Sequence, residues 1–325
     1  MASSLADPQP TPRPPPRLAW PVVSRRVAPY LFISPFFILF IAFTIFPTFY
    51  GLFLSFTKTR ITDLNTMTWN GLENYTFNLT DPMFWKAVTN TLILGVYGLM
   101  IQPIAVLLAF TIHMSLKRWR SLVTTLYFLP YITSSVAVAI VFSMVFSERV
   151  GVLNALISVL HGVPLLGALL PAQNVNWLGT PETIKPVIAL VVLWKWLGWN
   201  VLLYLARIQS IPQELYEAAK VDGATTAQQF WFVTLPQLSG TVFFNLTLTI
   251  IGQMNLFDEP YTMTGIDGGA GNAGLTVGVY LYKTMVDFKE AGTAAAMGWI
   301  LFVFVIVMTT VNNRIFGEAG RARGD

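Results

Sequence analysis

Six long apolar runs with very few charges constrain this chain more than any other feature of its sequence. Each run is long enough to cross the hydrocarbon core of a bilayer, which takes about 20 residues in a helix. Charged residues make up only 11% of the chain, against roughly 25% in an ordinary soluble domain. We therefore expect an all-α polytopic membrane protein with six transmembrane helices. The runs lie near residues 29–55, 86–113, 121–146, 186–207, 238–257 and 291–315.

A seventh run, residues 150–170, is almost as apolar but carries His161, Gly162 and Pro164 near its middle. The distribution of Lys and Arg argues against a seventh span, because these residues concentrate in cytoplasmic loops. With six spans and a cytoplasmic N-terminus, twelve Lys and Arg lie inside and six outside. A seventh span would move the basic C-terminus outside. We therefore expect 150–170 to be interfacial or re-entrant, and the short run 274–286 to lie on the surface.

Three regions follow from this pattern. Residues 1–28 are rich in proline and show no periodicity, so we predict a disordered cytoplasmic tail. A cleaved signal peptide is the competing interpretation, but the next apolar run is too long and no small-residue cleavage site is evident. Residues 29–316 form the transmembrane domain, and 317–325 form a cytoplasmic C-terminal tail.

The composition argues against several kinds of chemistry. Cysteine is absent and the histidines are His113 and His161, so we expect no metal site. No nucleophile and base form a recognisable catalytic set. The sequence lacks the phosphate-binding G-x-x-x-x-G-K-[ST] motif, so any ATP would bind to another chain. The net charge of +4 fits membrane topology rather than nucleic-acid binding, because no basic patch interleaves with aromatic residues.

The segment 209–236, between the fourth and fifth runs, has the local pattern of a helix–turn–helix. Ser210 and Gln213 have the spacing of a capping box, which would start a first helix. Thr225 and Gln228 repeat that spacing for a second short helix. We therefore expect a helical hairpin outside the membrane.

Glycine and proline mark the turns of this hairpin. Gly223 suits the left-handed conformation that ends a helix, and Pro236 is expected to close the second helix. Two short helices bury little surface against each other, so Leu215 and Tyr216 are expected to form an exposed apolar knob with neighbouring alanines. An exposed patch of this kind suggests a partner. The alternative is an amphipathic loop that lies on lipid headgroups.

One extended motif in the hairpin resembles the coupling-loop signature of bacterial ABC importer permeases. It reads Glu-Ala-Ala, three residues, Gly, nine residues, Val, one residue, Leu-Pro, with Val where Ile is usual. It covers Glu217, Ala218, Ala219, Gly223, Val233, Leu235 and Pro236. The segments 208–212 and 257–265 are similar to the binding-protein-dependent sugar permeases related to the MalF and UgpA subunits. The 264–271 loop departs from that group, because it is rich in glycine but lacks the usual proline.

The resemblance implies the fold of a type I ABC importer permease in a bacterial plasma membrane, with both termini cytoplasmic. ATP and Mg would bind a dimer of separate ATPase subunits, leaving no cofactor on this chain. A second permease subunit would complete the pathway, and an extracytoplasmic solute-binding protein or lipoprotein would deliver the solute. Glu217 would make the polar contact to the ATPase. The resemblance assigns coupling to Tyr216, Glu217, Ala218, Ala219, Asp222, Gly223, Leu235 and Pro236.

Polar residues inside the fourth and fifth runs suggest a solute pathway, because polar groups within a span are costly. Trp196 and Trp199 would offer an aromatic face to a sugar, and Asn200 adds a hydrogen-bonding group. By resemblance, sugar contacts in the family fall on the outer halves of these two helices. The predicted pathway residues are Gly198, Trp199, Asn200, Thr249, Gln253, Asn255 and Leu256. The competing interpretation is an interfacial tryptophan belt with polar contacts between helices.

Three charged residues lie close to this predicted pathway. Asp258 and Glu259 are expected at the outer membrane surface, where solvent reduces the cost of their charge. Lys195 lies within the fourth run and either snorkels outward or pairs with an acid.

Two other functions compete with an importer subunit. A secondary transporter driven by an ion gradient would need inverted repeats and buried carboxylates on broken helices, and the sequence has no clear repeat. A membrane-embedded enzyme would need converging catalytic groups. The solute stays open among a disaccharide, an oligosaccharide and a glycerophosphodiester.

Overall fold

The computed structural model describes residues 23–321, with gaps at 117, 164–166, 168–169 and 172. The chain divides into two compact units, Met1–Gly51 and Leu52–Asp325. Most of the predicted N-terminal tail, residues 1–22, lies outside the described residues. Helix α1 (Val23–Phe40) begins before the predicted tail ends at residue 28.

The first unit is a single apolar helical segment. After α1 it continues through a π-helical stretch (Ile41–Ile45) into α2 (Phe46–Ser55), whose last residues belong to the second unit. The span Val27–Ser55 has none of its most apolar window buried within the chain. Such a surface needs lipid or another protein around it.

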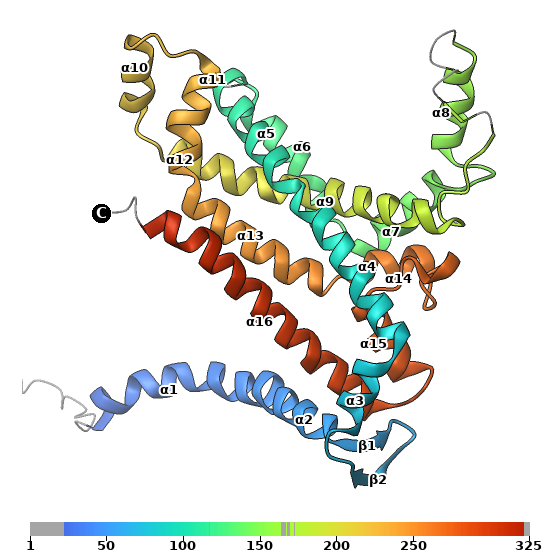
Figure 1. Cartoon of the computed structure of the whole chain (residues 1–325). Helices are drawn as coiled ribbons and strands as arrows, with labels where there is room; N and C mark the ends of the chain where they lie inside the picture. The colour runs from blue at the N-terminus through green and yellow to red at the C-terminus, as the bar shows by residue number, and fades with distance from the viewer. Residues whose placement is uncertain (1–22, 117, 164–166, 168–169, 172, 322–325) are drawn as a thin grey trace, which may run out of the picture. The chain divides into compact units, whose positions relative to one another are not determined.

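The second unit consists almost entirely of helices (Figure 1). The longer ones are α3 (Glu73–Thr80), α4 (Pro82–Leu99), α5 (Ile101–Ser115), α6 (Arg120–Ile132), α7 (Ser135–Val145), α8 (Val152–His161), α9 (Pro181–Gln209), α10 (Gln213–Val221), α13 (Ser239–Met254), α14 (Asp258–Thr264), α15 (Val277–Val286) and α16 (Ala291–Arg321). Short turns are α11 (Thr226–Gln229), a π-helical stretch (Phe230–Thr234), α12 (Leu235–Gln237) and a 3₁₀ turn (Ala270–Asn272). This architecture confirms the all-α prediction.

One small sheet was not predicted from the sequence. Strands β1 (Thr57–Arg60) and β2 (Asp63–Trp69) pair antiparallel, with an irregular register after Lys58. The amide of Asn74 in α3 donates to the carbonyl groups of Ser55 and Thr57 at 2.8 and 2.9 Å. These bonds hold the end of α2 and the start of β1 against α3.

The number of spans matches the sequence prediction once bent helices are counted. Within the part of the chain that the structure describes, four single helices are long and apolar enough to cross a membrane: Val27–Ser55, Pro82–Ser115, Pro181–Gln209 and Ala291–Ile315. Two further candidates are bent pairs, Arg120–Ile132 with Ser135–Val145 and Thr226–Gln237 with Ser239–Thr264. The described residues therefore provide up to six spans, but the third and fifth are not the straight helices that the apolar runs suggested.

The two bends differ in their backbones. Between α6 and α7 the helices turn by 96°, because Thr133 and Ser134 leave the helical region (ψ 143° and 130°). Between α12 and α13 the turn is 68°, yet the hydrogen bonding continues. Leu238 N donates to Thr234 O at 3.1 Å, and Val242 N donates to Leu238 O at 2.8 Å.

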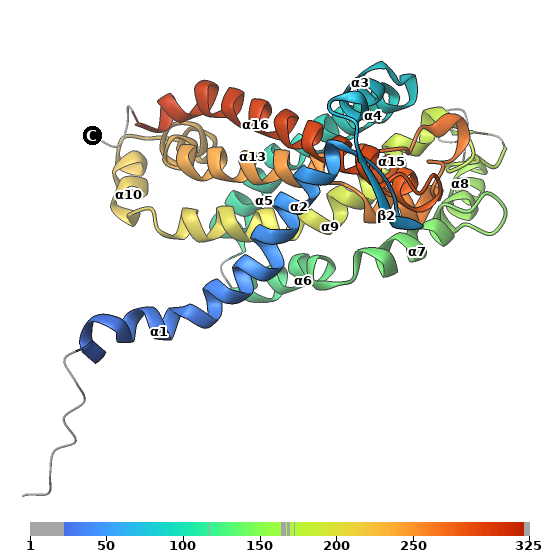
Figure 2. The same ribbon diagram turned by 90° about the horizontal axis from the view of Figure 1, so that it is seen from below.

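Helix α9 occupies the centre of the second unit. Its buried side chains form one core with α5, around Tyr204 and Ile208, and a second core with α7 and α14, around Ile188 and Val191. Helix α13 lies beside α9 on one side and α16 on the other (Figures 1 and 2). The polar faces of α9 and α13 are thus brought together.

Two shorter segments test the remaining predictions. Helix α8 has ten residues, too few to cross a bilayer, so the structure does not support a seventh span; several residues of 164–172 lie outside the described part. The prediction that 274–286 lies on the surface is wrong. Val277, Val279 and Tyr280 of α15 are buried against α4 and α16.

The predicted C-terminal tail, 317–325, is also partly helical. Helix α16 continues to Arg321, and residues 322–325 lie outside the described part of the chain. The boundary predicted at 316 therefore falls inside a helix.

Candidate functional site

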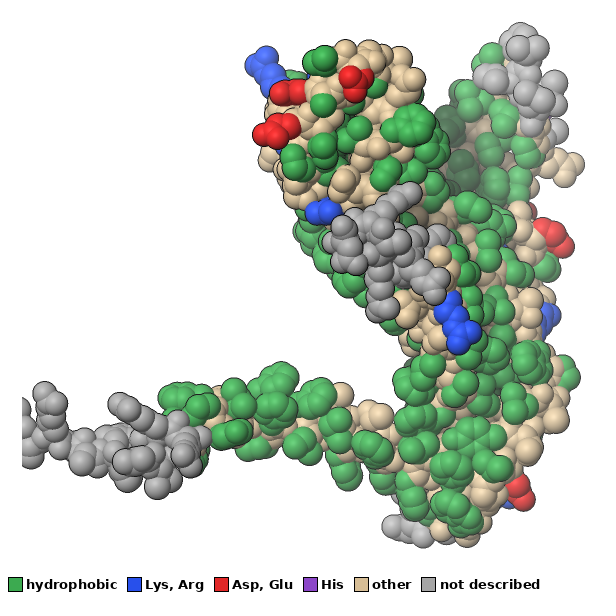
Figure 3. Space-filling view, turned by 60° about the vertical axis from the view of Figure 1, so that its left-hand side comes forward, with side chains coloured by type: hydrophobic (Ala, Val, Ile, Leu, Met, Phe, Trp, Pro, Cys, Tyr) green, Lys and Arg blue, Asp and Glu red, His purple; other side chains and the backbone are tan. Residues whose placement is uncertain are grey.

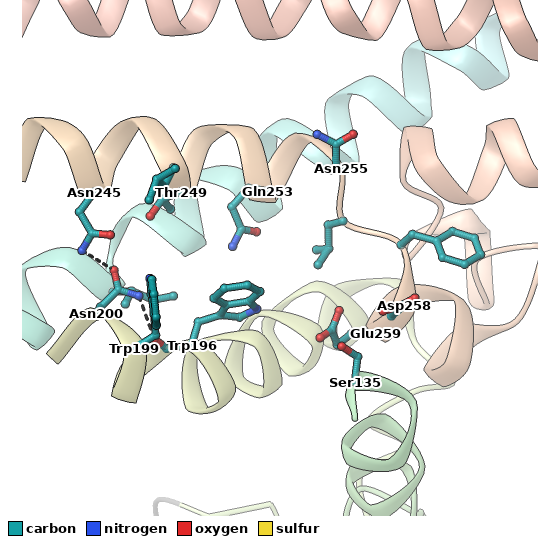
Figure 4. A pocket seen from close by; sticks show the side chains of 15 residues that line it. Ser135, Trp196, Trp199, Asn200, Asn245, Thr249, Gln253, Asn255, Asp258 and Glu259 are labelled. Carbon is teal, nitrogen blue, oxygen red and sulfur yellow. Dashed lines mark hydrogen bonds between the residues drawn. The ribbon is translucent and has the colours of Figure 1, made fainter. Parts of the chain in front are cut away.

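A cavity of about 220 Å³ lies between α9 and α13 and reaches the start of α14. Asn245, Thr249 and Gln253 project from α13 toward Trp196 and Trp199 of α9 (Figure 4). The remaining lining comes from Ile101, Ser135, Asn200, Leu248, Gly252, Asn255, Leu256, Phe257, Asp258 and Glu259. The cavity therefore combines amide and hydroxyl groups with aromatic surface.

The polar wall of the cavity follows from helical periodicity. Asn245, Thr249 and Gln253 are spaced four residues apart, so they lie on one face of α13. Asn245 and Gln253 are buried, while Thr249 is half-buried. A face of this kind offers donors and acceptors to a solute within an otherwise apolar span.

Gln102 of α5 is the centre of a buried hydrogen-bond network at the Asn245 end of the cavity. Its amide nitrogen donates to Asn200 Oδ1 at 3.0 Å and to Thr249 Oγ1 at 2.7 Å. Its oxygen accepts from the hydroxyl of Tyr204 and from Asn245 Nδ2. Asn245 Nδ2 also donates to Asn200 Oδ1 at 2.8 Å. These bonds fix side chains from α5, α9 and α13 in one arrangement.

Tyr131 of α6 holds the two cavity tryptophans. Its ring stacks on Trp199, with centroids 4.9 Å apart, and meets Trp196 edge-on at 5.3 Å. Both tryptophans are only half-buried. They therefore present aromatic surface to the cavity in a fixed orientation.

A buried ion pair closes the opposite end of the cavity. Lys195 Nζ lies 3.3 Å from Glu259 Oε1, and both side chains are almost inaccessible, at 6% and 4% exposure. Lys195 also donates to the hydroxyl of Ser135. The structure thus selects pairing with an acid over snorkelling for Lys195.

The prediction that Glu259 lies at the solvated outer surface is wrong. Glu259 is in the first turn of α14, which packs against α7 and α9 and excludes solvent from it. Asp258, one residue earlier, is exposed as expected. Among the described residues, no three His, Asp or Glu side chains group closely enough to hold a metal ion.

Gly198 is the predicted pathway residue that does not line the cavity. A Cβ at this position would lie 1.7 Å from the carbonyl oxygen of Tyr127. Gly198 therefore lets α6 and α9 approach closely, and its place in the pathway stays a prediction. Packing of this kind is the usual use of small residues between membrane helices.

The other six predicted pathway residues line one cavity: Trp199, Asn200, Thr249, Gln253, Asn255 and Leu256. Asn255 ends α13 and donates its side-chain amide to Ile251 O at 2.8 Å. Leu256 is buried in the link to α14. Their contact with a solute stays a prediction.

The helical hairpin forms the far end of the second unit (Figure 1). The sequence pattern predicted its second cap but not its first. Thr225 and Gln228 form the complete capping box of α11. Ser210 instead ends α9 and donates its hydroxyl to Arg207 O, so the Ser210–Gln213 capping box is wrong. Gly223 has φ +77° and ends α10 as predicted.

Tyr216 anchors α10 rather than forming an exposed knob. It is 6% exposed, and its hydroxyl hydrogen-bonds with Thr234 Oγ1 at 2.8 Å. Burial raises the pKa of the Tyr216 hydroxyl, and the hydrogen bond with Thr234 offsets part of that rise. The exposed large apolar side chains of α10 are Leu215 and Val221, and Trp231 and Phe232 are exposed later in the hairpin.

The predicted coupling residues divide between the surface and the interior of the hairpin. Glu217, Ala218, Asp222 and Gly223 are exposed; Ala219, Leu235 and Pro236 are half-buried. Glu217 accepts a hydrogen bond from Gln213 Nε2 at 2.7 Å. Acidic and basic side chains gather around α10, next to a mostly hydrophobic surface (Figure 3).

The glycine-rich 264–271 loop keeps a defined backbone without the usual proline. Gly265, Gly268, Gly269 and Gly271 all have φ between +57° and +74°. At Gly268 a Cβ would lie 2.3 Å from Leu275 N. Glycine thus permits both the turns and the close approach of two backbone segments.

Comparison with known proteins identifies the family to which the chain belongs. Residues 101–316 match the family described as "Binding-protein-dependent transport system inner membrane component". The chain belongs to this family. This permease is thus a multi-pass membrane subunit of an ABC transport system, and the secondary-transporter and enzyme alternatives are disfavoured.

Relatives of this permease are similar over most of their length. The arabinooligosaccharides transport system permease protein AraP of Bacillus subtilis (strain 168) is 32% identical, over 91% of this chain and 90% of AraP. The lactose transport system permease protein LacF of Rhizobium radiobacter is 32% identical, over 86% and 91%.

The fold is also that of a solved importer. A chain of a bacterial ABC transporter involved in the import of the acidic polysaccharide alginate superposes with a TM-score of 0.74 at 25% identity, covering 93% of this chain and 98% of that chain. A second structure contains that transporter with a pentasaccharide-bound periplasmic protein, and it matches with the same TM-score.

Proposed function

We propose that this permease forms half of a pathway for a sugar oligomer, with the α9–α13 cavity as its solute-contacting surface. The observation that carries this proposal is the cavity itself, where Thr249 and Gln253 face Trp196 and Trp199. Hydroxyl and amide groups pair with sugar hydroxyls, and tryptophan rings cover the apolar C–H face of a sugar. Named relatives that transport arabinooligosaccharides and lactose support this solute class.

Uptake by the assembled transporter tests this role. Gln253→Ala removes a buried cavity amide, and we expect uptake of the cognate oligosaccharide to fall about tenfold, the value of one or two lost hydrogen bonds. Gln237→Ala, on the exposed surface of α12, is the matched control and should transport normally. Equal uptake by the two variants would show that the cavity is not part of the solute pathway.

The proposal assigns energy coupling to the exposed face of α10. Glu217 and Asp222 are exposed on this face, while the buried Tyr216 holds the opposite side of α10 through its hydrogen bond with Thr234. A separate ATPase dimer would bind this face, with ATP and Mg on that partner. A second permease subunit and an extracytoplasmic solute-binding protein complete the assembly, in a bacterial membrane with both termini cytoplasmic.

Charge reversal on α10 tests the coupling role. Glu217→Lys should leave membrane insertion intact but abolish solute-stimulated ATP hydrolysis by the complex. Glu214→Lys, an exposed residue in the first turn of the same helix, is the control and should keep most activity. Normal coupling in Glu217→Lys, or labelling of a cysteine at Asp222 from outside the cell, would contradict the assignment.

A further inference from the structure

A second pocket, of about 530 Å³, lies where α6 begins and α9 ends. Two arginines, Arg118 and Arg120, line it together with the hydroxyl side chains of Ser121, Thr124 and Thr125. None of its lining residues is acidic. The pocket is therefore positively charged and rich in hydrogen-bond donors, and it is separate from the α9–α13 cavity.

Two of these donors are already buried without a partner. The Nε–H of Arg120 and the hydroxyl of Thr124 have no hydrogen-bond acceptor among the described residues, although both atoms are inaccessible to solvent. A buried donor without an acceptor costs about 1–3 kcal/mol. The described ion pairs, Lys195–Glu259 and Lys283–Asp267, involve neither arginine. The pocket thus lacks an anionic acceptor.

The surroundings of the pocket are those of a membrane boundary. Its α9 wall contains Leu202 and Leu205, and neighbouring Trp119 is 57% exposed, as tryptophans at headgroup level often are. Further along α6, the face that carries Ser121 continues with the exposed side chains of Leu129 and Ile132. A polar, basic head region therefore leads directly onto an apolar helix face.

We propose that this pocket binds the phosphate of an anionic phospholipid, whose acyl chains lie along the exposed face of α6. Phosphate oxygens accept hydrogen bonds from the guanidinium group of Arg118 and from the exposed hydroxyl groups of Ser121 and Thr125, and the two arginines balance the charge. A basic loop that served only to orient the chain would need exposed charge, but no pocket in which two arginines converge with hydroxyl side chains. Attraction of Lys and Arg to anionic lipid at a membrane surface supplies the same preference.

The position of the pocket gives the bound lipid a structural role. Gln209, the last residue of α9, lines it and is followed directly by the hairpin. Arg207 Nε donates to Gln237 O at 3.3 Å, which joins the two ends of the hairpin at its base. A lipid in the pocket would hold the start of α6 against this base.

The test measures lipid binding to the assembled transporter. The complex is purified in nanodiscs that contain equal parts of phosphatidylglycerol and phosphatidylcholine, and retained lipids are counted by native mass spectrometry. We expect phosphatidylglycerol to be preferred, and Arg120→Gln to lower that preference about fivefold. Ser121→Ala removes an exposed hydroxyl of the pocket and leaves the charge unchanged, and it should lower the preference about threefold.

Further measurements distinguish a lipid site from diffuse charge attraction, a free-phosphate site and a protein contact. Arg314→Gln removes an exposed charge at the end of α16 and should leave the preference unchanged; an equal loss there would show diffuse attraction and overturn the site. Inorganic phosphate and glycerol 3-phosphate should not displace the retained lipid, and displacement by either would identify a free-phosphate site instead. Crosslinking of a cysteine at Thr125 to the second permease would show that protein covers the pocket, which also contradicts the proposal.

Discussion

The α9–α13 cavity and the α10–α11 hairpin are held in place by opposite means. The cavity depends on side chains from distant parts of the sequence, as where Gln102 joins Asn200 and Thr249. The hairpin depends on local features, namely the Thr225 capping box and the left-handed Gly223, with Tyr216 as its buried anchor.

This difference predicts how far the destabilising effect of a substitution extends through the fold. A substitution around the cavity disturbs several packed helices at once, so it should lower the stability of the whole second unit. A substitution in the hairpin disturbs one helix end, so it should change coupling while the membrane helices remain folded. The stability of four variants tests this contrast.

The largest effect is expected at the α6–α9 contact. Gly198→Ala places a Cβ against the carbonyl oxygen of Tyr127, and backbone cannot yield as a flexible side chain would. We expect a loss above about 4 kcal/mol, at the extreme of single substitutions, seen as loss of folded permease in size-exclusion profiles. Gly252→Ala is the control, because its Cβ would meet no described atom within 4 Å. Similar yields for both variants would show that this contact can relax.

Next in size is the buried ion pair. Lys195→Met leaves Glu259 buried and uncompensated, which should cost about 3–5 kcal/mol. The double variant Lys195→Met/Glu259→Leu removes both charges and should regain most of that loss. Thermal unfolding of the four members of this cycle measures the coupling. If the double variant is no more stable than Lys195→Met, the two charges do not depend on each other.

A smaller loss is expected in the polar network. Gln102→Leu removes the acceptor of Tyr204 and Asn245, at a cost of about 1–3 kcal/mol. Unfolding in denaturant reports this change, with Gln237→Leu on the exposed surface as control. A stability equal to that of the unmodified permease would mean that the network contributes little to holding the three helices.

The smallest effect is expected in the hairpin. Gly223→Ala imposes a left-handed conformation on a residue with a Cβ, at a cost of about 1 kcal/mol, although the Cβ itself meets no described atom within 4 Å. Amide hydrogen exchange should quicken in α10 alone, and Gly223→Asn should do so less. Faster exchange throughout α9 and α13 would show that a substitution in the hairpin also destabilises the helices around the cavity.

The same contrast explains what the sequence could predict. Thr249 and Gln253 were predicted from helical spacing within one run, and the structure places both on the cavity wall. Gln102 and Tyr131 were missed, because their partners lie in other runs and nothing local connects them. Gln102 did carry one usable signal, a polar side chain within an apolar span.

Local patterns also failed where a neighbouring element decided the outcome. Ser210 and Thr225 have the same capping-box spacing, yet α9 extends to Gln209 and turns Ser210 into its C-terminal cap. Glu259 follows the exposed Asp258 directly, but the packing of α14 on α7 and α9 buries it. In both cases the missing information was tertiary contact.

The hydrogen-bonded bend at Leu238 joins the helical segments Thr226–Gln237 and Ser239–Met254, two arms of about 20 Å each. One arm ends beside the charged surface of α10, and the other carries Thr249 and Gln253 along the cavity. Because the backbone hydrogen bonds persist through the bend, a tilt of the first arm would move the second with it. Movement imposed on the hairpin by a partner would therefore reach the cavity through the main chain itself, without a relay of side chains.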